Sequence, residues 1–205
     1  LDDYYSYDPI VKSNPLGKLD MMDVNIGDHN PYSKYLLGWV NPIHLKEEGD
    51  YTLEPFQNEG KCYVLKDNWN GTPFDDYFML EFYTPDGLNK EDSSNAYCTN
   101  NPLLFTEMGV KIFHVDCQLS KIRYNSKESE PSYEYLGVTQ KVVYSVSGDY
   151  ITFTDFLFSN SPNSKGYKNT SVLIQLMESN TTFCNDHSSG TASNESVFNE
   201  GSTFP

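Results

Sequence analysis

Short apolar and aromatic runs recur along the chain from about residue 50, separated by Gly, Asn and Asp. Runs of this length, bounded by turn residues, predict β-strands. Many short aromatic strands between polar loops favour an antiparallel β-sandwich. The expected strands are Tyr51–Leu53, Lys61–Leu65, Tyr77–Tyr83, Val110–Cys117, Lys141–Val146, Tyr150–Phe158 and Val172–Met177, with Ser147-Gly148-Asp149 as a hairpin turn between the fifth and the sixth.

One helical pattern precedes these strands. Tyr32, Tyr35 and Leu36 recur at helical spacing, which predicts a short amphipathic helix with one face turned inward. Trp39 is expected to leave this helix as a buried residue. The ends carry the residues that begin and end helices: an N-cap asparagine, a proline at the first position and a glycine just past the end, namely Asn30, Pro31 and Gly38.

Charge and composition narrow the function classes. The chain carries 14 Lys and Arg against 29 Asp and Glu, a net charge of −15. Such a charge repels phosphate backbones and anionic membrane surfaces, so we expect no nucleic-acid binding. The longest apolar runs are too short to span a bilayer, so we expect no membrane insertion. The tail 179–205 is rich in Ser, Thr and Asn and is expected to be a long surface loop or an unfinished element.

The four cysteines leave two alternatives open. Cys62, Cys98, Cys117 and Cys184 are widely spaced and show no CxxC pattern, which argues against a cysteine zinc site. Two disulfides would agree with an extracellular setting, with three connectivities available. Four buried free thiols are the alternative.

The stretch 19–40 resembles a segment of metallopeptidases related to immune inhibitor A, just after their zinc-binding helix. The matching residues are Leu19-Asp20-Met21-Met22-Asp23, then the polar loop 25–30, then Tyr32-Ser33-Lys34 and Leu37-Gly38-Trp39. Leu19 stands where that family has a tryptophan. The resemblance continues through the sequence GVKIFHVD at 109–116 and so covers most of the chain.

This resemblance implies two site residues. Met22 takes the place of the methionine that forms a turn beneath the metal in metzincin-type enzymes. Leu1-Asp2-Asp3-Tyr4-Tyr5 resembles the end of the signature His-Glu-x-x-His-x-x-Gly-x-x-Asp, so Asp3 corresponds to its third zinc ligand. Two imidazoles and one carboxylate leave an open zinc position for water. In the simpler interpretation, Asp3 is a solvated loop acid and Met22 fills a gap in the core.

The His-Glu-x-x-His signature itself does not occur among the 205 residues. The resemblance therefore implies a fragment of a secreted or cell-surface zinc endopeptidase, whose zinc-activated water attacks peptide bonds in protein or peptide substrates. The general base and the histidine ligands would lie upstream, so the chain alone is expected to be inactive. The expected fold is α+β and predominantly β. Residues 1–40 end a metzincin-like catalytic domain, and residues 41–205 form a sandwich-like extension.

Three further sites invite functional and structural interpretations. His29 and Tyr32 are candidates to bind substrate, as donors to a peptide carbonyl or an oxyanion, or else they cap and close the loop. Glu81, His114 and Asp116 are candidates for a cluster that holds a metal, or else are satisfied polar residues at a sheet edge. The loop 67–71 is a candidate calcium site, or a plain turn anchored by its tryptophan.

A different class of function also fits the sequence. An acidic, aromatic-rich β-sandwich can serve as a non-catalytic extracellular module that binds glycan or protein, since Tyr and Trp side chains suit half-wet surfaces. Upstream sequence separates the two classes, because a His-Glu-x-x-His signature there would favour the peptidase. The sequence does not indicate an oligomeric state.

Overall fold

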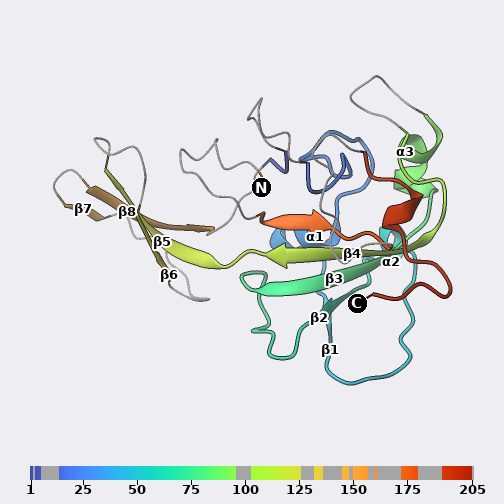
Figure 1. Cartoon of the computed structure of the whole chain (residues 1–205), viewed down its shortest axis with the longest axis horizontal. Helices are drawn as coiled ribbons and strands as arrows, with labels where there is room; N and C mark the ends of the chain where they lie inside the picture. Colours follow the sequence, from blue (N-terminus) through green and yellow to red (C-terminus); the bar gives the residue numbers. More distant parts are fainter. Residues whose placement is uncertain are drawn as a thin grey trace.

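A five-stranded, mostly antiparallel sheet of order β1-β2-β3-β4-β9 forms the centre of this mixed α/β chain (Figure 1). The computed structural model describes residues 1, 3–5, 14–95, 103–125, 132–135, 145–147, 150–156, 160, 172–179 and 191–204. The strands of this sheet are β1 (Ile43–Leu45), β2 (Cys62–Leu65), β3 (Asp76–Tyr83), β4 (Gly109–Asp116) and β9 (Ile174–Leu176). The helices are α1 (Pro31–Leu36), α2 (Phe56–Glu59), α3 (Lys90–Ser94), and the 3-10 turns η1 (Gly87–Asn89) and η3 (Asn194–Ser196).

The strands predicted over Lys61–Leu65, Tyr77–Tyr83, Val110–Cys117 and Val172–Met177 are confirmed as β2, β3, β4 and β9, to within a few residues at each end. β3 and β4 pair antiparallel along their full lengths. β4 lies between β3 and β9, which explains why apolar residues occur on both of its faces. The strand expected over Tyr51–Leu53 does not form, and β1, which pairs parallel to β2, was not predicted.

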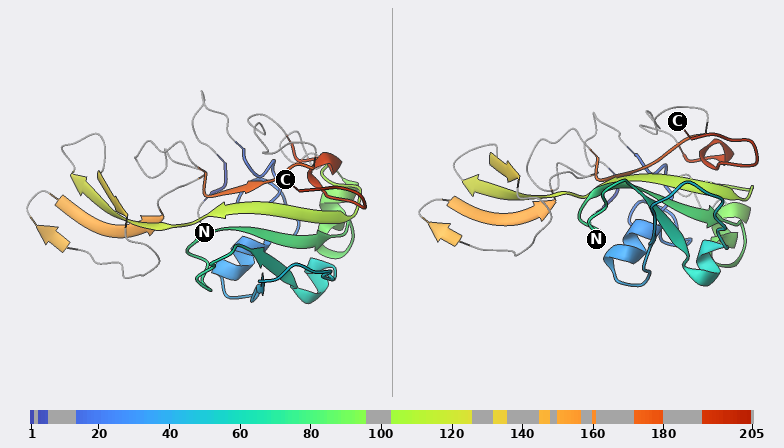
Figure 2. Two further views of the ribbon diagram at one scale, coloured as in Figure 1. Left: turned by 60° about the horizontal axis from the view of Figure 1, so that its bottom comes forward. Right: turned by 90° about the horizontal axis from the view of Figure 1, so that it is seen from below.

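A second sheet extends from the end of β4 as an arm, which Figures 1 and 2 show beside the first sheet. Its order is β6-β5-β8-β7, with β5 (Leu119–Asn125), β6 (Ser132–Tyr135), β7 (Ser145–Ser147) and β8 (Tyr150–Phe156). β7 and β8 pair antiparallel with Ser147 opposite Tyr150, as the predicted hairpin requires. β8 confirms the strand expected over Tyr150–Phe158 as far as residue 156, whereas β5 and β6 were not predicted. Residues 141–144, 148–149 and 157–158 of the predicted hairpin lie outside the described residues.

One face of the first sheet carries the main core. The stretch before α1 packs there together with the sheet, so residues from the first forty share one core with later ones. Figure 2 shows α1 lying against this side of the sheet. The fully buried members include Tyr4, Leu16, Tyr32, Val64, Met79 and Phe113.

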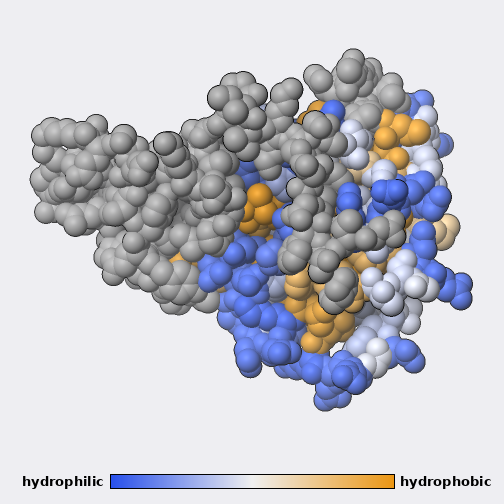
Figure 3. Space-filling model, viewed as in Figure 1, coloured by the Kyte–Doolittle hydropathy of each residue, from blue (hydrophilic) through white to orange (hydrophobic). Residues whose placement is uncertain are grey.

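The other face of the sheet is covered by the tail, which was predicted to be a surface loop. Phe198 pairs through its backbone with Val110, and the Phe204 ring lies 5.0 Å from that of Phe78. Together with Ile112 these residues belong to a second, smaller cluster, and Figure 3 shows hydrophobic residues gathered on this side. Residues 191–204 thus pack on the sheet and cover apolar side chains that this face would otherwise expose.

Helix α1 begins and ends as its sequence predicts. The Asn30 side chain accepts the Ser33 N–H at 2.9 Å, and Pro31 occupies the first turn. Gly38 follows the helix at φ +74°, a conformation that glycine adopts at little cost. This turn directs Trp39 outward, where it is 63% exposed. The expectation that Trp39 is buried is therefore wrong.

Gly27 packs against Asp92 of α3, and this contact yields a stability prediction. A Cβ at Gly27 would overlap the Asp92 carboxylate, whose Oδ1 accepts the Ile26 N–H at 3.4 Å. We expect Gly27→Ala to lower the free energy of unfolding by about 1–3 kcal/mol. Gly49→Ala is the matched control, because a Cβ there meets only ordinary contacts with Tyr51. Urea unfolding measures both, and equal stabilities would contradict the close approach at Gly27.

Two of the four cysteines fall within the described residues. Cys62 and Cys117 are buried free thiols, so they follow the free-thiol alternative and not the disulfide one. Burial raises the pKa of each thiol to about 12. Cys98 and Cys184 lie outside the described residues.

Candidate functional site

Asp20 is the centre of a buried polar cluster between the N-terminal loop and α1. Its side chain is fully buried, and Oδ1 accepts the N–H of Met22 at 2.8 Å and Nδ1–H of His29 at 3.2 Å. Oδ2 accepts the backbone N–H of Asn30 at 2.7 Å and its side-chain N–H at 2.8 Å. A carboxylate with this many donors is held in one orientation, so it fixes the loop around it.

Met22 and the segment around Asp3 meet through the backbone. The Tyr4 N–H donates to the Met22 carbonyl at 2.9 Å, and the Tyr4 hydroxyl lies 2.9 Å from the hydroxyl of Ser33 on α1. The structure thus places the neighbour of Asp3 directly against Met22, which packs partly buried on the core. Asp3 itself is half-buried.

His29 is held by Asp20 and lies beside Trp39. Its side chain is 15% exposed, and its ring meets the Trp39 ring edge-on, with centroids 5.9 Å apart. The hydrogen bond to Asp20 raises the pKa of the His29 imidazole above its usual value, against the opposing effect of burial. Because Nδ1–H is committed to Asp20, Nε2 is the ring atom left for a ligand.

Tyr32 cannot serve as the expected substrate contact. It is fully buried in the main core, where burial raises the pKa of its hydroxyl well above the usual range. The hydroxyl has no hydrogen-bond partner among the described residues. The correction has a simple cause: the helical spacing that turns Tyr35 and Leu36 inward also places Tyr32 on the innermost side of α1.

A pocket beside His29 has room for roughly one water molecule. It lies between the loop before α1, the start of α2 and the strands β3 and β4. Apolar walls come from Leu19, Phe56 and Phe82. Its polar lining consists of Asp28, His29, Asn30, Glu81, Asn89 and Lys111.

Glu81 and Lys111 form a buried ion pair in the lining of this pocket. Their charged atoms lie 3.4 Å apart, and the ammonium also lies 3.8 Å from the centroid of the Tyr83 ring. Burial raises the pKa of Glu81 to about 7 and lowers the pKa of Lys111. Oε1 of Glu81 is the atom paired with Lys111, while Oε2 is buried without a partner.

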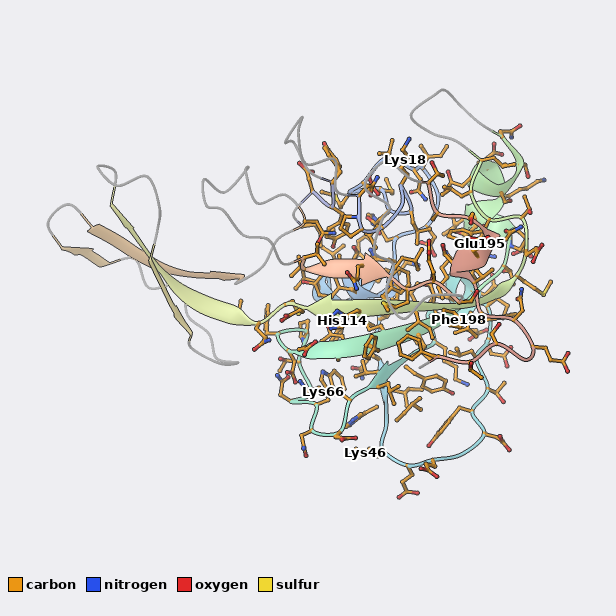
Figure 4. All side chains as sticks on the ribbon, in the orientation of Figure 1. Lys18, Lys46, Lys66, His114, Glu195 and Phe198 are labelled. Atoms are coloured by element: carbon orange, nitrogen blue, oxygen red, sulfur yellow. The ribbon has the colours of Figure 1, made fainter. Side chains whose placement is uncertain are left out.

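The proposed cluster of Glu81 with His114 and Asp116 does not form. Glu81 lies opposite Lys111 on the core face, whereas His114 belongs to the other face. His114 pairs instead with Asp76, Nε2 to Oδ1 at 2.8 Å, which supports the structural interpretation. This pairing lowers the pKa of Asp76. Figure 4 labels His114 toward one end of β4 and Phe198 toward the other.

The loop 67–71 is an anchored turn. The Trp69 indole N–H donates to the Thr72 carbonyl at 3.0 Å, and its ring packs against those of Tyr35, His44 and Tyr77. Asp75, the nearby acid, is paired with Lys66 at 2.7 Å. Across the described part of the chain, no three His, Cys, Asp or Glu side chains converge as a metal site.

Asp23 gives the fold a pH dependence. It accepts the Lys18 N–H at 2.6 Å, yet burial raises its pKa from 3.8 to about 7. The folded state therefore holds this proton more tightly than the unfolded chain, and its contribution, at most about 4 kcal/mol, is full below pH 4 and lost as pH rises to about 7. We expect Asp23→Asn to flatten the dependence of the melting temperature on pH between 4 and 7. An unchanged slope would contradict the assignment.

Comparisons with protein-family models, with curated proteins and with solved structures found no match to this chain. In the described residues, no helix has both the length and the apolar character needed to cross a membrane. Sequence reasoning missed Asp20 and Lys111 as site residues, and it grouped Glu81 with His114 and Asp116 and not with Lys111. The opposite charges at facing positions of β3 and β4 were the signal for the pair of Glu81 and Lys111.

Proposed function

We propose that this chain is part of a secreted zinc-dependent endopeptidase, with residues 1–40 forming the end of its metzincin-like catalytic domain and the rest a sandwich-like extension. The observation that supports this best is the hydrogen bond between Tyr4 and Met22. It brings the predicted metal ligand, Asp3, close to the predicted methionine turn although eighteen residues separate them in sequence. Asp20 accepts hydrogen bonds from both Met22 and His29, so His29 lies close to Met22 as well.

The described residues do not form a zinc site by themselves. Asp3 supplies one carboxylate, and a structural zinc or catalytic zinc needs at least three protein ligands. The proposal therefore assigns the other ligands and the general base to a segment outside this sequence, and no catalytic step through the metal follows from this chain alone. In this proposal, His29 is the residue that contacts a bound peptide.

The proposal predicts that the purified chain does not digest casein, with or without added zinc, because it lacks the general base and two ligands. A longer polypeptide carrying an upstream His-Glu-x-x-His segment should bind zinc and digest casein. In that polypeptide Asp3→Ala should lose most of its zinc, whereas Asp67→Ala, in an exposed turn, should keep it. Metal analysis decides the assignment, and equal zinc contents would refute the role of Asp3. Chelator-sensitive digestion by the chain alone would also refute the proposal.

Exposed aromatic residues favour a second candidate, a non-catalytic module that binds glycan or protein. Trp39 is 63% exposed and Tyr51 is 48% exposed, and such rings stack well on sugars and on partner side chains. Trp39→Ala should then abolish retention on a glycan or protein array without changing the melting temperature. Full retention by the variant would remove this candidate.

A further inference from the structure

Asn70 begins one of four Asn-x-Ser/Thr sequences in the chain, and it lies in the loop between β2 and β3. Such sequences are acceptors for N-linked glycans, a bulky modification that a folded protein carries on its surface. The other three begin at Asn169, Asn180 and Asn194. Residues 169–171 and 180–182 lie outside the described residues, so the structure compares Asn70 with Asn194.

The side chain of Asn70 lies in an open turn. Asn70 and Gly71 are both exposed, and a Cβ added at Gly71 would meet nothing within 4 Å. Oδ1 of Asn70 accepts the backbone N–H of Thr72 at 2.8 Å and the Thr72 hydroxyl at 2.7 Å. The amide that would be modified and the hydroxyl that makes the sequence an acceptor are therefore in direct contact within an exposed turn.

The nitrogen atom that would carry the glycan has one hydrogen to spare. Nδ2 of Asn70 bears two hydrogens, and it donates to the Phe74 carbonyl at 3.1 Å. A glycan replaces only one of the two hydrogens, and it leaves the bonds that Oδ1 accepts from Thr72 in place. The turn is also held from another side, because the Trp69 indole N–H donates to the Thr72 carbonyl at 3.0 Å. The turn therefore accommodates the modification without losing the contacts that shape it.

Asn194 has the same sequence pattern in a closed setting. Its Oδ1 accepts the backbone N–H groups of Thr106 at 2.9 Å and Glu107 at 3.2 Å, and its Nδ2 donates to the Thr106 hydroxyl at 2.9 Å. Ser196, the third residue of this sequence, is fully buried. Asn194 thus ties the tail to the loop before β4, and the hydroxyl of its acceptor sequence is out of reach in the folded chain.

We propose that Asn70 is an N-glycosylation site when the chain passes through a eukaryotic secretory pathway. The donor is an oligosaccharide joined to a lipid through a pyrophosphate. A bond forms between Nδ2 of Asn70 and the anomeric carbon of the sugar, while the bond from that carbon to the pyrophosphate oxygen breaks. Nδ2 gives up one proton, and the lipid pyrophosphate leaves with the electron pair of the broken bond. The proposal shares secretion with the proposed function but needs neither zinc nor proteolysis.

Secretion of the full chain from cultured eukaryotic cells, behind an added signal peptide, tests the proposal. An N-glycosidase converts each glycan-bearing Asn to Asp, and in heavy-oxygen water the new Asp takes up the label. Peptide mass spectrometry thereby separates glycan release from the spontaneous deamidation of Asn-Gly, which proceeds in an untreated sample without label. We expect label at Asn70 and none at Asn194 in chains recovered from cells and medium. No label at Asn70 would overturn the proposal, and equal labelling of Asn194 would refute the role of the exposed turn.

Variants separate the acceptor sequence from the turn that holds it. Thr72→Ala removes the hydroxyl and should abolish the label at Asn70, whereas Thr72→Ser keeps a hydroxyl and should keep the label. Asn70→Asp retains the oxygen atoms that accept from Thr72 but has no amide nitrogen, so it should fold and migrate as the unglycosylated chain. Asn68→Gln, an exposed change in the same loop, is the control and should leave the glycan unchanged. Label that persists at Asn70 in Thr72→Ala would overturn the proposal.

Discussion

Asp20→Ala is expected to lower the free energy of unfolding by more than about 4 kcal/mol, a large part of the roughly 5–15 kcal/mol that stabilises an ordinary domain. The carboxylate is fully buried and accepts from Met22, Asn30 and His29 at 2.7–3.2 Å. Alanine leaves these donors without an acceptor, and each buried unsatisfied donor costs about 1–3 kcal/mol. The change also frees the loop that joins Tyr4 to α1. Circular dichroism during urea unfolding gives the loss.

Asp67→Ala is the control for this change, because Asp67 is exposed and lies in the turn anchored by Trp69. It should alter stability by less than about 0.5 kcal/mol. If both aspartate variants lose the same small amount, Asp20 does not organise the N-terminal loop. The His29 imidazole offers a second readout: in any folded Asp20 variant its pKa should fall toward the ordinary value, because the hydrogen bond that raises it is gone.

Lys111→Met should be nearly as costly, at about 3–5 kcal/mol, because it leaves the Glu81 carboxylate buried without a counter-charge. The loss should grow as pH rises through the pKa of Glu81, where the carboxylate must ionise in an apolar site. The double variant Glu81→Leu/Lys111→Met removes both charges and keeps the volume. It should recover most of the loss, since a buried pair contributes little beyond matching its own desolvation.

A double-mutant cycle at pH 8 measures this coupling directly. The matched pair on the opposite face is Asp76 with His114, which is more exposed, with side chains 47% and 26% accessible. Its coupling should be no more than about 1 kcal/mol. A coupling at Glu81 and Lys111 as small as that of the exposed pair would mean that the buried charges are not paired as described.

The sequence predicted those elements that are determined by residues close to them in the chain. Asn30, Pro31 and Gly38 act within one turn of α1, so the helix could be placed from its own residues. Trp39 could not, because its exposure depends on the direction that Gly38 gives the chain. β4 was predictable as a central strand because apolar residues occupy both of its faces.

The hydrophobic pattern of β3 did not predict which face of the strand meets the main core. Phe78 and Leu80 make one face apolar, while Tyr77 and Met79 do the same for the other, so alternation alone could not tell which face meets the main core. The structure places Glu81 on the core side, opposite Lys111. Asp20 gave no signal of this kind, because its partners are backbone and side-chain donors brought together only by the folded loop.

Strands β4 and β9 are neighbours in the first sheet, yet all strands of the second sheet lie between them in the sequence. The chain must therefore travel out along β5 and back before the first sheet can gain its last strand, and such non-local pairing slows folding. Asn160 binds the segment that leads into β9. Its buried side chain accepts the Leu173 N–H at 2.8 Å and donates to the Ile174 carbonyl at 2.7 Å. Until then the edge of β4 is open to strands of other molecules. We therefore expect a change that removes these Asn160 contacts to slow the return and to leave each newly made chain exposed to aggregation for longer.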